Sequence, residues 1–124
     1  PETWGIGVDL CAVSRMARAI EKAHFFTRVF TENERAYLQS RGRAVGQSAA
    51  AMFAAKEAVA KALGTGFAQG VMPWQIEVTH EQSGKPGILL TGAAREKFEQ
   101  IGGQSILLSL SHEGDTAIAF ALIQ

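Results

Sequence analysis

Two carboxylates and a lysine are the residues of this sequence whose types and spacing could do chemistry together. Glu57 and Lys61 stand four residues apart in an alanine-rich run, so a helix would place both on one face. Asp9 lies in an alternating segment near the start, and the turn Gly64-Thr65-Gly66 follows the alanine-rich run. Magnesium prefers oxygen ligands, typically one or two carboxylates completed by phosphate oxygens and water. A fold that brings Asp9 to Glu57 would therefore build a magnesium and phosphate site.

Each of these residues also has a plainer interpretation. Glu57 and Lys61 at this spacing suit an exposed ion pair worth about 0.3–0.5 kcal/mol. Asp9 suits a solvated strand residue, because spacing alone does not bring it to Glu57. His112 closes the segment Ser109-Leu110-Ser111 and suits either a partly exposed side chain or an imidazole at the rim of a cleft.

Other chemistries fit the sequence less well. Ser111, His112 and Asp115 have the residue types of a hydrolytic triad, but residues this close in sequence rarely adopt that geometry. There is also no Gly-x-Ser-x-Gly elbow. The histidines are far apart, at His24, His80 and His112, and with a single cysteine they offer zinc few ligands. Neither standard nucleotide-binding glycine loop is present.

The amino-terminal segments must position Asp9. Residues 4–10 alternate in hydrophobicity, which predicts a short strand with Asp9 facing away from the core. The core side of that strand would carry Ile6, Val8 and Leu10. A helix capped by Ser14 is predicted to run to about residue 24. Its apolar stripe would be Val13, Met16, Ile20 and Ala23, and its basic face Arg15, Arg18 and Lys22.

The longest predicted helix carries Glu57 and Lys61. It runs from about residue 44 to residue 63 and ends at Gly64. Its apolar stripe would be Met52, Ala55, Val59 and Leu63. Before it, Thr31-Glu32-Asn33-Glu34 has the order of a capping box, which predicts a short helix to about residue 40.

The second half of the chain predicts two pairs of antiparallel strands. Turn chemistry at residues 83–87 separates strands near residues 75–79 and 88–90, and Thr91 is expected to cap a helix over residues 93–101. Two more strands, near residues 105–112 and 116–123, are joined across Glu113-Gly114-Asp115. Helices gathered with antiparallel strands predict an α+β fold, with the long helix laid across a small sheet.

Size and composition limit the class of protein. A chain of 124 residues suits one domain over residues 1–124, and its 47% hydrophobic and 19% charged residues exclude a disordered protein. Twelve basic and twelve acidic residues cancel, so charge gives no case for nucleic acid as a partner. A lone cysteine, no signal-like start and no membrane-length apolar run favour a cytoplasmic location without membrane contact. Pro1 is not an initiator, so we expect a processed or excised chain.

Four segments of the chain resemble one enzyme family, holo-acyl-carrier-protein synthase. They are Gly5-Ile6-Gly7-Val8-Asp9-Leu10, Phe53-Ala54-Ala55-Lys56-Glu57-Ala58 with Lys61-Ala62-Leu63-Gly64-Thr65-Gly66, Gly84-Lys85-Pro86, and Leu108-Ser109-Leu110-Ser111-His112. Their order and spacing agree with the family over nearly the whole chain. The central motif is specific, whereas the glycine-lysine-proline turn would be weak by itself.

The resemblance implies the 4′-phosphopantetheinyl transferase fold and activity. Such an enzyme moves the 4′-phosphopantetheine arm of coenzyme A to a serine of apo acyl carrier protein, with magnesium, and releases 3′,5′-adenosine bisphosphate. The implied carrier belongs to a fatty-acid, polyketide or other synthase. The implied assembly is a cytoplasmic homotrimer with active sites at its subunit interfaces.

The resemblance also implies a role for each matching residue. Asp9 and Glu57 match metal-binding carboxylates, and Glu57 is the candidate to take the serine proton, directly or through a water. Lys61 matches the lysine beside the leaving phosphate, where it and magnesium would stabilise the developing charge. The remaining coenzyme A contacts would come from the turn Gly64, Thr65 and Gly66, from Gly84 and Pro86, and from His112 of the neighbouring subunit.

A basic segment is the expected docking surface for the acidic carrier protein. The implied docking residues are Arg15, Arg18, Lys22, Phe25 and Arg28. Their alternative interpretation is a solvated basic face with an aromatic residue in the core. A noncatalytic oligomeric module that binds a nucleotide or an acidic partner through the same loops is the competing function.

The chain departs from the family pattern at two positions. Met52 stands where the family commonly has an arginine, and Ala12 where it commonly has a glutamate. The first departure concerns a phosphate contact, and the second an acidic residue near the metal. Neither removes the set of Asp9, Glu57 and Lys61.

Overall fold

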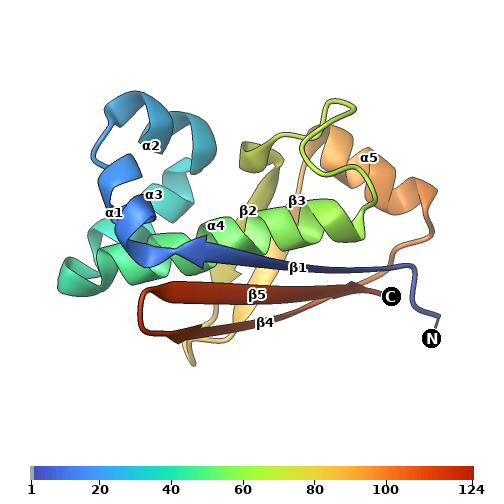
Figure 1. The fold of residues 1–124 in the computed structure, drawn as a ribbon. Coiled ribbons are helices and arrows are strands. Elements are labelled where there is room, and N and C mark those ends of the chain that lie inside the picture. The colour runs from blue at the N-terminus through green and yellow to red at the C-terminus, as the bar shows by residue number, and fades with distance from the viewer. Residues whose placement is uncertain (1) are drawn as a thin grey trace.

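Helix α4, Val45–Ala62, runs along one face of a three-stranded antiparallel sheet in the computed structural model, which describes residues 2–124 (Figure 1). Pro1 lies outside the described residues, so the expectation of a processed or excised chain is not tested. The sheet has the order β1-β5-β4, formed by Gly5–Ala12, Thr116–Ile123 and Ile106–Glu113. A second antiparallel sheet pairs β2, Ile76–His80, with β3, Pro86–Leu90. The predicted α+β fold is confirmed, with its strands divided between two small sheets.

The remaining helices cover the two ends of α4. Helices α1 to α3 gather at one end and α5 lies at the other (Figure 1). Their bounds are Val13–Ala19 for α1, Ala23–Val29 for α2, Glu32–Gln39 for α3 and Gly92–Gln100 for α5. Short 3-10 turns at Gly42–Ala44 and Pro73–Gln75 precede α4 and β2. None of the helices in residues 2–124 is both long and apolar enough to cross a membrane.

The face that β1 turns to the core is the reverse of the predicted one. Ile6, Val8 and Leu10 are 61%, 49% and 61% exposed, whereas Gly7 and Cys11 are buried. A Cβ atom added at Gly7 would lie 1.9 Å from the carbonyl oxygen of Ala58 on α4, so only glycine permits this approach. Small residues, not the large apolar ones, fill the space between strand and helix.

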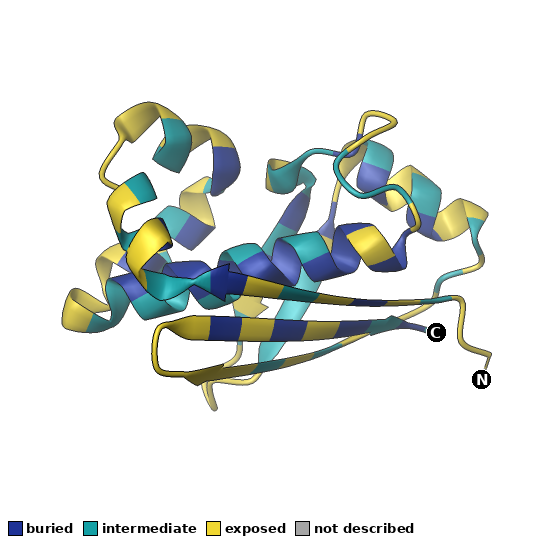
Figure 2. Cartoon of the chain, in the orientation of Figure 1, coloured by how far each residue is buried: buried dark blue, intermediate teal, exposed yellow. Residues whose placement is uncertain are grey.

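Strand β5 follows the same rule. Its alternate residues Ala117, Ala119 and Ala121 are fully buried, while Ile118 and Phe120 are exposed. Figure 2 shows this alternation of buried and exposed residues along β5. Asp9 lies on the same side of β1 as Gly7 and Cys11, so its carboxylate faces α4 and its side chain is only 15% exposed. The prediction that Asp9 faces away from the core is therefore wrong.

The predicted first helix is divided into α1 and α2, and Ser14 does not cap it. The N-cap residue of α1 is Ala12, without a side-chain capping bond. The backbone N–H and the hydroxyl of Ser14 instead donate to Asp115, at 2.8 and 2.6 Å. Asp115 lies in the turn between β4 and β5, so a distant residue satisfies the first turn of α1. Ala23, predicted in the apolar stripe, is exposed at the start of α2.

Other local predictions are confirmed. Thr31 and Glu34 form the capping box at the start of α3. The stripe of Met52, Ala55, Val59 and Leu63 is buried. Thr91 is the N-cap residue of α5, although its hydroxyl makes no capping bond.

Candidate active site

Strand β1 and helix α4 bring Asp9 to Lys61. The Nζ atom of Lys61 lies 3.0 Å from Asp9 Oδ1 and 3.0 Å from the carbonyl oxygen of Val8. Lys61 keeps 52% of its side chain exposed, so its ammonium group can also meet a ligand. In the part of the chain that the structure describes, Lys61 pairs with Asp9 and not with Glu57. Glu57 and Lys61 therefore do not form the i,i+4 ion pair that their spacing suits.

Glu57 is a half-buried carboxylate in the same neighbourhood. Burial raises the pKa of Glu57, and the nearby Asp9 carboxylate raises it further, while Lys61 and Arg15 oppose both effects. A carboxylate whose charge is disfavoured by burial and by a neighbouring carboxylate provides a place where a cation is stabilised. Among residues 2–124 no third histidine, cysteine, aspartate or glutamate completes a metal-binding group with them. This donor set suits magnesium, which takes its remaining ligands from phosphate and water.

The glycine turn after α4 ends the helix, and its backbone N–H groups are not free to bind a phosphate. Gly64 and Gly66 have φ angles of +86° and +57°, which favour glycine. The N–H of Gly64 donates to Lys61 O, and those of Thr65 and Gly66 donate to Ala60 O. The three amides therefore satisfy helix carbonyls. A ligand would meet the open side of the turn, where a Cβ atom added at either glycine would meet nothing within 4 Å.

His112 and Gly84 line a separate pocket of about 220 Å³. The side-chain amide nitrogen of Gln47 and His112 Nδ1 form a hydrogen bond of 2.9 Å. Pro86 begins β3 close by in sequence but does not line the pocket. Asp9, Glu57 and Lys61 do not line it either. Within one chain, the group of Asp9, Glu57 and Lys61 thus lies outside the pocket that contains His112 and Gly84.

Some of the predicted docking residues lie on the surface, and one is packed against the core. Arg15, Arg18 and Lys22 border one shallow depression of about 470 Å³. Arg28 is exposed near the end of α2. Phe25 is half-buried, with its ring centre 6.3 Å from that of Phe30 and 6.3 Å from that of Phe53. The basic residues are accessible, whereas Phe25 belongs to an aromatic cluster.

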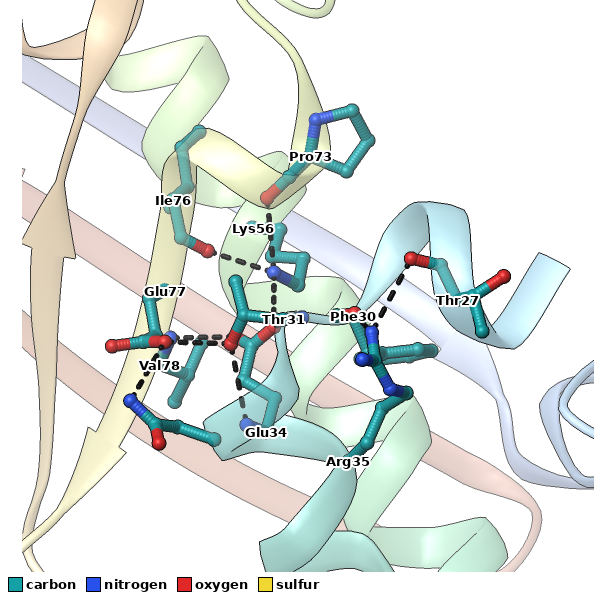
Figure 3. A network of polar contacts seen from close by, with 11 residues as sticks. Thr27, Phe30, Thr31, Glu34, Arg35, Lys56, Pro73, Ile76, Glu77 and Val78 are labelled. Carbon is teal, nitrogen blue, oxygen red and sulfur yellow. Dashed lines mark hydrogen bonds and ion pairs between the residues drawn. The ribbon is translucent and has the colours of Figure 1, made fainter. Parts of the chain in front are cut away.

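Sequence reasoning missed Lys56, the neighbour of Glu57. Its side chain is fully buried, and Nζ donates to Glu34 Oε1 at 2.7 Å, to Pro73 O at 2.9 Å and to Ile76 O at 2.8 Å (Figure 3). All three ammonium donors are satisfied. A signal for this burial was present, since Lys56 follows Met52 by four residues and precedes Val59 by three, on the apolar stripe.

The buried lysine fixes α4 against two other elements. Glu34 accepts from the backbone N–H of Thr31 at 2.8 Å and from that of Val78 at 2.7 Å, in addition to Lys56. The pair therefore ties α4 to α3 and to β2, as Figure 3 shows. The next residue on α4 is Glu57, so the helix that this network anchors is the one that carries the site carboxylate.

Comparison with known proteins shows which proteins this chain resembles. The family model described as "4'-phosphopantetheinyl transferase superfamily" matches residues 5–121. A holo-[acyl-carrier-protein] synthase of Desulforudis audaxviator is 48% identical over 120 residues, which cover 95% of this chain and 90% of that protein. The crystal structure of the synthase from Neisseria meningitidis has a TM-score of 0.86 and 35% identity, with 99% of both chains covered.

A third relative was solved with a ligand. The synthase from Bacillus anthracis, a structure in complex with CoA (3′,5′-ADP), has a TM-score of 0.81 and 31% identity, and covers 98% of this chain and 96% of that one. Sequence and fold agree along almost the full length. The chain therefore belongs to the 4′-phosphopantetheinyl transferase superfamily, among its holo-acyl-carrier-protein synthases.

Proposed function

We propose that residues 1–124 act as one domain that transfers the 4′-phosphopantetheine arm of coenzyme A to a serine of apo acyl carrier protein. The reaction releases 3′,5′-adenosine bisphosphate and depends on magnesium. The observation that carries this proposal is the meeting of Asp9 and Lys61, at 3.0 Å, beside Glu57. This contact brings two carboxylates and an ammonium group together on adjoining elements, in a chain that belongs to the family.

The charges of this cluster fit the proposed reaction. Asp9 and Glu57 would hold a magnesium ion, which supplies positive charge to the substrate phosphates when bound. The carrier serine attacks the pantetheine-side phosphorus, the bond from that phosphorus to the leaving oxygen breaks, and the bisphosphate departs with added negative charge. Lys61, half-exposed, stabilises that charge. Glu57, whose pKa burial raises, takes the serine proton directly or through a water.

A homotrimer with shared active sites is part of the proposal. The sheet face that points away from α4 exposes a continuous set of apolar residues: Ile6, Val8, Leu10, Leu107, Ile118 and Phe120. A patch of this kind is typical of a protein interface. A second copy on this face would cover it. In the proposed trimer, His112 of one subunit completes the Asp9, Glu57 and Lys61 group of the next.

The acyl carrier protein is the proposed partner of the basic surface. Arg15, Arg18 and Lys22 border one depression, and Arg28 is exposed on the following helix. A positively charged surface attracts an acidic protein during encounter and can pair with its carboxylates in the complex. Phe25 would support this surface from the aromatic cluster below it, because its ring packs on Phe30 and Phe53.

Mass spectrometry of a purified apo carrier tests the proposed function. Incubation with this protein, coenzyme A and magnesium should add the mass of one phosphopantetheine group to the carrier. Asp9→Ala and Glu57→Ala should abolish the gain while the proteins stay folded, because each removes a candidate metal ligand and not a core side chain. A Glu99→Ala variant, which changes an exposed carboxylate on α5, serves as the control.

Two results would count against the proposal. A carrier that gains no mass while the protein still binds coenzyme A would favour the noncatalytic module. Wild-type turnover by Glu57→Ala at saturating magnesium would remove the metal and base assignments.

A further inference from the structure

The start of α1 is held by a residue from the other end of the chain. The backbone N–H of Val13 donates to the carbonyl oxygen of Asp115 at 2.7 Å. The backbone N–H of Ser14 donates to Asp115 Oδ1 at 2.8 Å, and the Ser14 hydroxyl donates to Asp115 Oδ2 at 2.6 Å. One residue thus accepts three hydrogen bonds from the first turn of α1, and both oxygens of its carboxylate take part.

Strand pairing brings Asp115 to this position. Strand β1 ends at Ala12, whose partner on β5 is Thr116, and Asp115 directly precedes Thr116 in the turn after β4. The chain passes from β1 straight into α1, so the β4–β5 turn and the first turn of α1 lie at the same end of the sheet (Figure 1). The contact between Ser14 and Asp115 therefore follows from the register of the sheet, although the two residues are 101 positions apart.

Helix α1 has no capping group of its own. Its N-cap residue, Ala12, makes no side-chain hydrogen bond, and the first turn contains no acidic residue. Isolated helices shorter than about 12 residues are marginal in water, and α1 has only 7, so its stability depends on tertiary contacts. Asp115 supplies the acceptors and the negative charge that favour the start of a helix.

Packing against α4 holds the middle of α1. Met16 is buried, and Gly46 of α4 approaches Ala17 so closely that a Cβ atom added at Gly46 would lie 2.9 Å from Ala17 Cβ. The contact between Ser14 and Asp115 adds a second fixed point, at the start of the helix. Two fixed points along a short helix determine the direction of its axis, and with it the direction of the side chains that it exposes.

The residues that follow Ser14 carry the basic surface. Arg15 and Arg18 border the depression proposed for the carrier, and Arg18 lies four residues after Ser14, on the same face of the helix. The hydrogen bonds from Ser14 lower the pKa of Asp115, and the charge of Arg18 lowers it further. Within residues 2–124 no ion pair joins Asp115 to Arg18, so Asp115 holds the backbone of α1 and not the guanidinium group.

We propose that Asp115 is a positioning residue for carrier docking, which holds the start of α1 so that Arg15 and Arg18 face the acidic carrier. This inference rests on the proposed function, since it concerns the carrier of the same reaction. The charge of Asp115 by itself would have the opposite effect, because an acidic side chain beside a basic surface weakens the attraction to an acidic protein. Position and charge therefore predict changes of opposite sign.

Transfer kinetics with variants of Asp115 and Ser14 test this role. Asp115→Asn cannot accept both bonds from Ser14, and Ser14→Ala loses the hydroxyl bond while the charge of Asp115 remains. Both variants should raise the KM of the carrier about 3-fold or more, and should leave the KM of coenzyme A and kcat nearly unchanged. Ser14→Thr keeps a hydroxyl group and should restore the carrier KM to the wild-type value.

Two further comparisons separate position from charge. Glu21 borders the same depression, so Glu21→Gln removes an acidic charge near the carrier and should lower the carrier KM, the opposite of Asp115→Asn. In a background of Arg15→Gln with Arg18→Gln, Asp115→Asn should no longer raise the carrier KM, because the side chains that it positions are gone. A lower carrier KM in Asp115→Asn, or the same rise in that background, would overturn the inference.

Two measurements that need no transfer keep this inference separable from the reaction. Hydrogen exchange of the α1 amides should be faster in Asp115→Asn and Ser14→Ala, with the α4 amides unchanged, and calorimetry should show weaker binding of the apo carrier. If wild type binds the carrier without transferring the arm, and both variants bind it more weakly, the proposed function fails and the positioning role stands. If wild type transfers the arm and both variants bind the carrier as wild type does, the function stands and the positioning role is wrong.

Discussion

Lys56 Nζ lies 2.7 Å from Glu34 Oε1, and neither side chain is exposed. Burial lowers the pKa of Lys56, while the charge of Glu34 raises it. Breaking such a pair leaves one charge buried without its partner, which is costly. The pair also joins α4 to α3 and β2, so its loss should affect the position of Glu57 as well as stability.

Lys56→Met should lower the free energy of unfolding by about 3–5 kcal/mol, because Glu34 is left buried without its cation. The double variant Lys56→Met with Glu34→Gln should recover part of this loss, since it removes both charges. Urea unfolding of the single and double variants measures the effect. Arg95→Met is the matched control, as it breaks an exposed pair with Glu99 and should cost about 0–1 kcal/mol. Similar losses for Lys56→Met and Arg95→Met would contradict the assigned role.

Asp115 should make stability depend on acid pH. The hydrogen bonds from the Ser14 hydroxyl and the Ser14 backbone N–H lower the pKa of Asp115 below its ordinary value of 3.8. A carboxyl whose pKa is lowered by folding contributes stability above the unfolded pKa, and that contribution is lost as the pH falls through the folded pKa. Asp115→Asn should therefore be less stable than wild type at neutral pH, and the difference should shrink below about pH 4.

Melting temperatures of wild type and Asp115→Asn between pH 6 and pH 3 check this prediction. Glu99→Gln, which changes an exposed carboxylate on α5, should show little pH-dependent difference from wild type. A constant gap between Asp115→Asn and wild type over the whole range would mean that the charge of Asp115 does not matter.

Arg15→Glu should weaken docking of the carrier. The substitution reverses a charge at the edge of the basic depression, so the KM for the carrier should rise much more than that for coenzyme A. Added salt should weaken the wild-type enzyme in the same direction. Arg95→Glu makes the same charge change on α5, at the other end of α4, and should leave the carrier KM nearly unchanged (Figure 1). Equal increases of both KM values in Arg15→Glu would exclude Arg15 from docking.

Mixing two inactive variants tests the shared active site. Glu57→Ala and His112→Ala should each be nearly inactive, yet mixed trimers should place some intact Glu57 beside an intact His112. With equal amounts and cyclic closure, roughly a quarter of the interfaces should be fully wild type, and activity should recover to about that fraction. Co-refolding followed by the carrier assay measures it. No recovery from verified mixed trimers would confine the site to one subunit and leave the chemistry intact.

Local signals in the sequence were enough for most of the elements, although the predicted first helix is divided into α1 and α2. The capping box at Thr31 and Glu34, the apolar stripe of α4 and the glycines that end it depend on residues within a few positions of one another. The four segments that resemble the family also gave the fold class and the enzyme. These features are properties of short stretches of chain, so a linear reading can find them.

The tertiary structure decided which faces meet. The alternation of β1 was visible, but its direction was reversed, because Gly7 and Ala58 pack too closely for larger side chains to lie between strand and helix. That reversal is what turns Asp9 toward Lys61. The same holds for Lys56, whose partner Glu34 lies 22 positions earlier in the sequence. Contacts between distant segments depend on how closely small residues let two backbones approach each other. The spacing of apolar residues within one segment does not contain this information.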